Sequence, residues 1–310
     1  MKLISFVPVG TKIRFLQYRK AAILASLVLC IASIGLYATK GLNYGIDFRG
    51  GILLEIRTQG PADHQQIRQQ IGELDLGNFE IQGFGEPTDV LIRIETQPGG
   101  APGQQKAIEA VRKALGENID YRRQEFVGPT VSGELVQAGI MAVLLALVAM
   151  LVYIWFRFEW QFGVGAVVAL THDVLMTIGM FSVVGLEFNL TTVAAILTIA
   201  GYSINDTVVV YDRVRENLRK YKVMKLEEVL DLSLNDTLSR TLLTSVTTMI
   251  ALLILYIWGG EVIKGFAFAM IWGVLVGTYS SIFIAAPLLI QMNLRAQDVA
   301  LDEDDAATAS

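Results

Sequence analysis

The sequence predicts an α-helical integral membrane protein with six transmembrane helices and one small α+β domain inserted between the first two helices. Hydrophobic residues make up 53% of the 310 residues and charged residues only 18%, with a mean hydropathy of +0.49. A soluble domain needs a more polar surface than this composition provides. The charged residues are also concentrated in a few stretches, and the apolar segments between them include six that reach the roughly 20 residues a bilayer crossing needs.

The six predicted transmembrane helices cover most of the chain outside the inserted domain. Their expected ranges are residues 21–40, 135–156, 162–186, 190–211, 241–258 and 266–292. The first follows a basic N-terminus, as the core of a signal peptide would. Its apolar run is longer than the ~7–15 residues of a signal core, and no small-x-small cleavage site closes it. We therefore expect it to remain in the protein as a membrane anchor.

The orientation in the membrane follows from the basic residues, because short flanks rich in lysine and arginine stay in the cytoplasm. The N-terminus over residues 1–20, the turn at Arg157 and the connection over residues 212–240 are basic, and the opposite connections carry few basic residues. We predict that these segments and a tail over residues 293–310 are cytoplasmic, with the inserted domain on the other side. Within 212–240, an amphipathic stretch is typical of a connector helix at the membrane interface.

The inserted domain over residues 41–134 has its own pattern of strands and helices. The expected elements are a strand at 51–57, a helix at 62–74, strands at 79–84 and 89–96, a helix at 104–115 and a strand at 121–127. The order β-α-β-β-α-β is that of the ferredoxin-like split βαβ fold, which serves many functions. We expect no metal site, because no cluster of ligating residues is present, and no nucleic-acid partner, because the net charge is −5.

Function is expected among the polar groups inside the membrane, because a charge at the centre of a helix costs about 2.5–3.5 kcal/mol there. Asp206 lies in the fourth helix, and Arg240 opens the fifth helix from the same side. Burial favours the neutral form of a carboxyl group, and a nearby guanidinium favours the charged form. A movable Asp206–Arg240 pair can therefore take up and release a proton, as coupling to a proton gradient requires. The alternative is a static pair that holds the helices together.

A second group of polar residues gives a weaker indication of function. Asp173 and His172 are adjacent near the middle of the third helix, where His172 or hydroxyl groups can satisfy Asp173 structurally. Asp212 and Arg213 are expected at the level of the lipid headgroups, where an ion pair costs little and serves as an anchor. Asn205 belongs to the polar run of the fourth helix.

Four stretches of the sequence carry a resemblance to a known family. They read GIDFRGG at 45–51, VGPTVSGEL at 127–135, GYSINDTVVVYDR at 201–213 and SRTLLTS at 239–245. Together they resemble the SecD/SecF family, and the second stretch resembles its SecF branch. The similarity covers nearly the whole chain outside the termini. In the first stretch, the family motif is carried by Gly45, Asp47, Arg49, Gly50 and Gly51.

The resemblance implies a bacterial inner-membrane subunit that pairs with SecD in an assembly related to the resistance-nodulation-division transporters. It implies association with the SecYEG channel and accessory subunits such as YajC, while the SecA motor acts on the same channel. The proton-motive force would help precursor proteins leave the channel on the periplasmic side, where the domain over 41–134 would lie. The resemblance assigns the proton pathway to Asp206 and Arg240. It implies protons as the coupling ion, no other cofactor, and membrane lipids as the surroundings.

Three other classes of function fit the sequence less well. A small-molecule or lipid exporter of the same superfamily would need large paired periplasmic domains, and this chain has one small domain. A scaffold subunit that conducts no protons would not need Asp206 to titrate. An intramembrane hydrolase would need a nucleophile and a base on facing helices, and only His172 with Ser203 or Ser182 offers a start. We therefore expect no catalytic residues and no enzymatic activity.

Overall fold

The computed structural model describes residues 8, 11–83, 85–116, 118–292 and 294. The chain forms two compact units. The first, which we call the helical unit, contains Met1–Asn43, Val143–Leu186 and Thr191–Ser310, and the second, the sheet unit, contains Tyr44–Ala142 and Glu187–Leu190. Most of the predicted tail over 293–310, and the first seven residues of the predicted N-terminal segment, lie outside the described residues.

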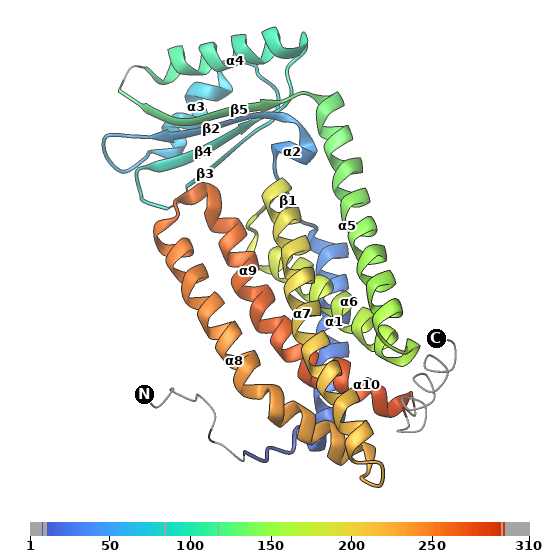
Figure 1. Ribbon diagram of the computed structural model, residues 1–310. Coiled ribbons are helices and arrows are strands. Elements are labelled where there is room, and N and C mark those ends of the chain that lie inside the picture. The colour runs from blue at the N-terminus through green and yellow to red at the C-terminus, as the bar shows by residue number, and fades with distance from the viewer. Residues whose placement is uncertain (1–7, 9–10, 84, 117, 293, 295–310) are drawn as a thin grey trace. The chain divides into compact units, whose positions relative to one another are not determined.

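Long helices make up most of the helical unit (Figure 1). The helices and turns outside the sheet are η1 (Phe15–Tyr18), α1 (Arg19–Lys40), α5 (Pro129–Arg157), α6 (Trp160–Val184), α7 (Leu190–Lys220), α8 (Leu226–Trp258), α9 (Glu261–Ser280), η2 (Ser281–Ala285) and α10 (Ala286–Gln291). Among the described residues, six spans are long and apolar enough to cross a membrane, with hydropathies of 1.6 to 2.6. A helix suits the interior of a membrane because its backbone N–H and C=O groups form hydrogen bonds with one another inside the same segment. The prediction of six apolar helices is confirmed.

The segment predicted as a connection over residues 212–240 is largely helical. Helix α7 continues to Lys220, and α8 begins at Leu226 and runs without a break into the fifth membrane span. The first turns of α8 are held in place because one face of them is buried. Val229 and Leu230 are fully buried in the main core of the helical unit. The amphipathic stretch therefore extends a membrane helix and does not form a separate connector.

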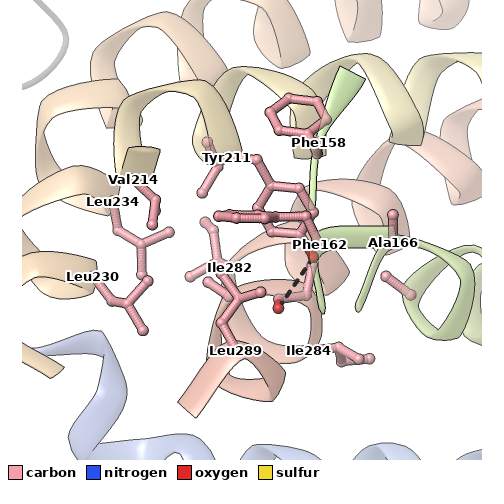
Figure 2. Packing of buried hydrophobic residues seen from close by; sticks show 14 of the residues in the cluster. Phe158, Phe162, Ala166, Tyr211, Val214, Leu230, Leu234, Ile282, Ile284 and Leu289 are labelled. Carbon is pink, nitrogen blue, oxygen red and sulfur yellow. Dashed lines mark hydrogen bonds between the residues drawn. The ribbon is translucent and has the colours of Figure 1, made fainter. Parts of the chain in front are cut away.

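The core of the helical unit is centred on Tyr211, whose ring is fully buried (Figure 2). The centroid of the Tyr211 ring lies 4.9 Å from the centroid of the Phe162 ring, in an edge-to-face arrangement, and 6.0 Å from the centroid of the Phe158 ring. The Tyr211 hydroxyl donates a hydrogen bond to the Ala285 carbonyl at 3.3 Å. Gly165 leaves room for this hydroxyl, because a Cβ at that position would lie 2.4 Å from it. These contacts tie α6, α7 and η2 together.

The sheet unit contains a four-stranded antiparallel sheet with α3 and α4 on one face (Figure 1). Its elements are α2 (Ile46–Arg49), β2 (Gly51–Arg57), α3 (His64–Gly72), β3 (Phe79–Gly83), β4 (Asp89–Ile94), α4 (Gly100–Leu115) and β5 (Asp120–Val127). The strand order is β3-β4-β2-β5, so each helix connects two parallel strands across an intervening one, as in the split βαβ fold. A second, two-stranded sheet joins β1 (Asn43–Tyr44) and β6 (Glu187–Phe188).

The four-stranded sheet has a hydrophobic core of its own, built from alternate strand residues and one face of each helix. The contributing side chains are Ile52, Leu54, Ile56, Val90, Ile92, Ile94, Ile67, Ile71, Ala107, Ile108 and Val111. Helix α3 presents two isoleucines one turn apart, which places them on the same face. It begins at Asp63, whose Oδ1 accepts hydrogen bonds from the backbone N–H groups of Gln65 and Gln66, both at 3.0 Å.

The ion pair between Arg57 and Asp89 makes the stability of the sheet unit depend on pH. Arg57 donates from Nε and Nη2 to the two carboxylate oxygens, at 2.5 and 2.6 Å, and Asp89 is 5% exposed. These hydrogen bonds lower the pKa of Asp89, and burial opposes them. Because the folded pKa lies below the unfolded value of about 3.9, the pair stabilises the folded unit above that pH, and its contribution is lost as the pH falls through the folded pKa.

Hydrogen exchange in β2 and β4, corrected for the intrinsic rate at each pH, should therefore show protection that decreases at acidic pH. The Asp89→Asn variant should lose part of this dependence, because it has no carboxyl group to protonate. If the variant and the original chain lose protection over the same pH range and to the same extent, Asp89 is not the responsible group.

Candidate functional site

Asp206 lies in the interior of α7, far from either end of the helix, within a short polar run of an otherwise apolar span. It is 7% exposed, whereas the neighbouring Asn205 is exposed. Successive residues of a helix point about 100° apart, so these two polar side chains occupy different faces. The helix therefore directs Asp206 into the protein and Asn205 away from it.

The Asp206 carboxylate is held by hydroxyl groups from two other elements. Thr241 Oγ1 of α8 donates to Asp206 Oδ1 at 2.7 Å, and Ser281 Oγ of η2 donates to Oδ2 at 2.5 Å. Hydrogen bonds of this kind stabilise the ionised form. A hydroxyl group can also accept a hydrogen bond, so the same partners can serve a protonated Asp206. The cluster can therefore accommodate the carboxyl group in either protonation state.

Arg240 lies beside this cluster but is not bonded to it. It precedes Thr241 in α8, its side chain is exposed, and it interacts electrostatically with Asp206. Of the residues that the structure describes, those that bond directly to the Asp206 carboxylate are the two hydroxyl donors, and no ion pair joins it to Arg240. The structure thus brings the two predicted residues near one another without the direct pair that the static interpretation requires.

Asp173 forms a second buried carboxylate cluster. It is fully buried in α6, and its Oδ1 lies 2.9 Å from Nδ1 of His172. Its Oδ2 accepts hydrogen bonds from Ser203 Oγ at 2.5 Å and from Ser280 Oγ at 2.8 Å. Asp173 is therefore bonded both to His172 and to hydroxyl groups from α7 and α9.

The two carboxylate clusters share the same helices. Ser203 and Asp206 are three residues apart on α7, and so lie on one face. Ser280 and Ser281 are consecutive, yet each contacts a different carboxylate. They lie where α9 passes into the π-helical turn η2, and such turns occur frequently at functional sites. Neither serine was predicted as a site residue; their signal in the sequence is a run of four hydroxyl residues, Thr278–Ser281, in an otherwise apolar segment.

Asp212 and Arg213 form ion pairs near the end of α7. Arg157 of α5 donates to Asp212 at 2.6 Å, and Arg213 contacts Glu216 at 2.6 Å and Asp236 of α8 at 2.9 Å. These side chains are partly exposed. Their contacts fasten α7 to α5 and α8, separately from the two buried clusters.

The family-motif residues lie in the sheet unit, where they shape the start of the sheet. Gly50 and Gly51 have φ values of +74° and +108°, a region that other residues rarely adopt. Arg49 lies 3.9 Å from Glu80. Asp47 Oδ2 accepts a hydrogen bond from the backbone N–H of Leu190 at 2.9 Å. The motif therefore combines a glycine-dependent bend with a contact to the first residue of α7.

The chemistry available to the buried clusters is proton binding. Each combines a carboxyl group with hydroxyl partners that can either donate or accept. Among the described residues, no group of three or more histidine, cysteine, aspartate or glutamate side chains is placed to hold a metal ion.

Two family descriptions match the chain. Residues 107–295, more than half of the chain, match "Protein export membrane protein SecD/SecF, C-terminal". Residues 38–62, which include α2 and both glycines after it, match "SecD/SecF GG Motif".

Individual relatives agree with these matches. The protein translocase subunit SecF of Rickettsia bellii is 45% identical over 282 residues, which cover 89% of this chain and 91% of that protein. The protein translocase subunit SecDF of Brucella abortus is 44% identical over 307 residues, 99% of this chain and 40% of that longer protein. The crystal structure of SecDF from Thermus thermophilus, described as a translocon-associated membrane protein, matches with a TM-score of 0.84 and 35% identity, over 93% of this chain and 40% of that chain. The chain belongs to the SecD/SecF family of protein-export membrane proteins.

Proposed function

We propose that this chain is the SecF-type subunit of a protein translocase in the bacterial inner membrane. The main support is the 45% identity with the Rickettsia subunit of that name, which extends over about nine-tenths of both chains. The Brucella SecDF protein is one longer chain of which the present chain matches 40%. A separate SecD protein would supply the remainder as a partner. The assembly would serve the SecYEG channel with accessory subunits such as YajC, while SecA drives precursor proteins into the channel.

The sheet unit is proposed to lie on the periplasmic side and both termini in the cytoplasm. The basic residues support this orientation, because they gather in the N-terminal segment and around the connection between α7 and α8. The sheet unit would then lie on the side where precursor proteins emerge. Its ferredoxin-like topology is compatible with many roles, so the placement rests on the charge distribution.

Proton movement through Asp206 is proposed to drive the export step. The observation that carries this proposal is a carboxyl group, 7% exposed in a membrane-spanning helix, held by hydroxyl groups from two other elements. Protonation removes the attraction between the carboxylate and Arg240 and turns one carboxyl oxygen into a donor. One of the two hydroxyl contacts must then reverse its direction. The resulting shift among α7, α8 and η2 would move the periplasmic domain, so that an emerging polypeptide is pulled outward or kept from sliding back.

Inverted membrane vesicles test this function. Vesicles that contain the chain and its SecD partner should complete export of a precursor faster when a proton gradient is present, and an ionophore should remove the difference after the SecA-driven step has finished. Vesicles without the chain should show no such difference. An equal effect of the ionophore in both preparations would contradict proton coupling through this chain. Export that needs the chain but ignores the ionophore would instead support the scaffold alternative.

A further inference from the structure

We propose that Asp47 is a positioning residue that clamps the start of α7 to the sheet unit and so transmits the movement of Asp206 to that unit. The contact between Asp47 and α7 is seen directly in the structure. The effect of this contact on export rests on the proposed function.

Asp47 acts as a cap for a helix that is distant in the sequence. Its Oδ2 accepts a hydrogen bond at 2.9 Å from the backbone N–H of Leu190, the first residue of α7, across a separation of 143 residues. The first N–H groups of a helix have no acceptor within the helix, and the helix dipole favours a negative charge at this end. A carboxylate therefore suits this position, although such caps are ordinarily supplied by a residue next to the helix.

Further contacts hold the short connection between α6 and α7 to the sheet unit. The Gly45 N–H donates to the carbonyl of Phe188 at 2.9 Å. Arg93 of β4, whose side chain is only 12% exposed, donates to Glu187 at 3.0 Å. A Cβ at Gly45 would lie 2.4 Å from Glu187 Oε1, so the glycine permits this close approach. Residues 187–190 accordingly belong to the sheet unit, although the chain on both sides of them belongs to the helical unit.

Aromatic rings add a hydrophobic contact at the same place. The Phe48 ring, in α2 beside Asp47, has its centroid 5.9 Å from that of Phe188 and 6.3 Å from that of Tyr44. The Tyr44 and Phe188 rings lie 6.1 Å apart in an edge-to-face arrangement. Pairs of rings at these distances stabilise a contact beyond the area they bury. The capped end of α7 is therefore fixed by polar and apolar contacts together.

The clamp lies on the helix that carries the candidate proton site. Helix α7 is continuous from Leu190 to Lys220, so Asp206 stands about 24 Å along the same helix from the cap. A displacement of α7 along its axis pushes or pulls on Asp47 and, through Glu187, on β4. Proton-dependent movement at Asp206 is thereby passed to the sheet unit along one helix.

The experiment measures both the cap and its consequence. In the full chain with its SecD partner, Asp47→Ala should speed hydrogen exchange at Leu190 and the next amides of α7 about fivefold and remove most of the proton-dependent export. Asp47→Asn keeps an acceptor oxygen and should retain most of both. Asp63→Ala is the matched control, because it removes the cap of α3 in the same unit and should leave α7 exchange and export unchanged.

Several outcomes would overturn the clamp. One is unchanged α7 exchange in Asp47→Ala; another is faster exchange with normal export. A third is an Asp47→Asn variant that keeps α7 protected but loses export, because Asp47 would then act through its charge. If Asp47→Ala does not accumulate in the membrane, Asp47→Leu fills the space of the carboxylate without an acceptor oxygen and should give the same pair of effects; normal exchange and export in that variant would contradict the clamp. If the proposed function is wrong, the Asp206→Asn variant will still show proton-dependent export. That outcome would not affect the hydrogen-exchange result for Asp47→Ala.

Discussion

Replacement of Asp206 by asparagine is expected to abolish the proton-dependent stage of export while the chain remains folded in the membrane. Asparagine has nearly the same shape, and its amide can bond to hydroxyl partners such as Thr241 and Ser281. It cannot take up or release a proton at physiological pH. Export in membrane vesicles should therefore fall to the rate seen without a proton gradient, and it should no longer respond to an ionophore.

Asp212→Asn provides a matched control for this prediction. It makes the same substitution on the same helix, at a partly exposed position paired with Arg157. Because exposed ion pairs contribute little, about 0–1 kcal/mol, this variant should keep its proton-dependent export. Retention of the full ionophore-sensitive rate by Asp206→Asn would show that Asp206 is not the coupling group. Loss of export in both variants would point instead to a general loss of structure.

Substitution of Gly51 by alanine is expected to disrupt the sheet unit. Gly51 has a φ of +108°, and a Cβ there would lie 2.4 Å from the carbonyl oxygen of Ile94. That oxygen belongs to the backbone of the strand paired with β2, so no flexible side chain can move aside. The backbone conformation alone costs about 1–3 kcal/mol for a residue other than glycine, and the displacement of β4 adds to this cost. The variant should show much faster hydrogen exchange in β2 and β4 and greater sensitivity to proteases.

Gly60→Ala is the control for the glycine prediction. Gly60 lies in the same unit, has no positive φ, and has no atom within 4 Å of the position of an added Cβ. Alanine there should leave exchange in the sheet within the range of ordinary surface substitutions, about ±0.5 kcal/mol. Equal protection of β2 in both variants would contradict the requirement for glycine at position 51.

The apolar helices and the order of strands could be predicted because each depends on local pattern. Long uncharged runs leave few alternatives to a membrane helix, and the alternation of residues such as Ile52, Leu54 and Ile56 indicates a strand. The ends of the helices are harder to predict from the sequence. The charged stretch after Tyr211 suggests a loop, but its apolar face is buried against the core, and that tertiary contact extends α7 and α8.

The site could be predicted only in part. Asp206 is evident from the sequence because a carboxylate in an apolar segment needs a partner. Its partners, Thr241 and Ser281, lie 35 and 75 residues away, and hydroxyl residues are too common for spacing to identify them. The contact between Asp47 and Leu190 involves a backbone N–H group, which every residue except proline possesses, so no pattern of side chains could indicate it.

Residues 187–190, where the chain passes from α6 into α7, restrict how the two units can move. The chain passes between the units after Asn43, Ala142, Leu186 and Leu190. A domain inserted once has two covalent connections and can swing about the line that joins them. Two additional connections remove much of that rotational freedom, because a swing would have to stretch or bend residues 187–190. Relative motion of the units is thus coupled by the covalent chain to motion of α6 and α7, even before any non-covalent contact is considered.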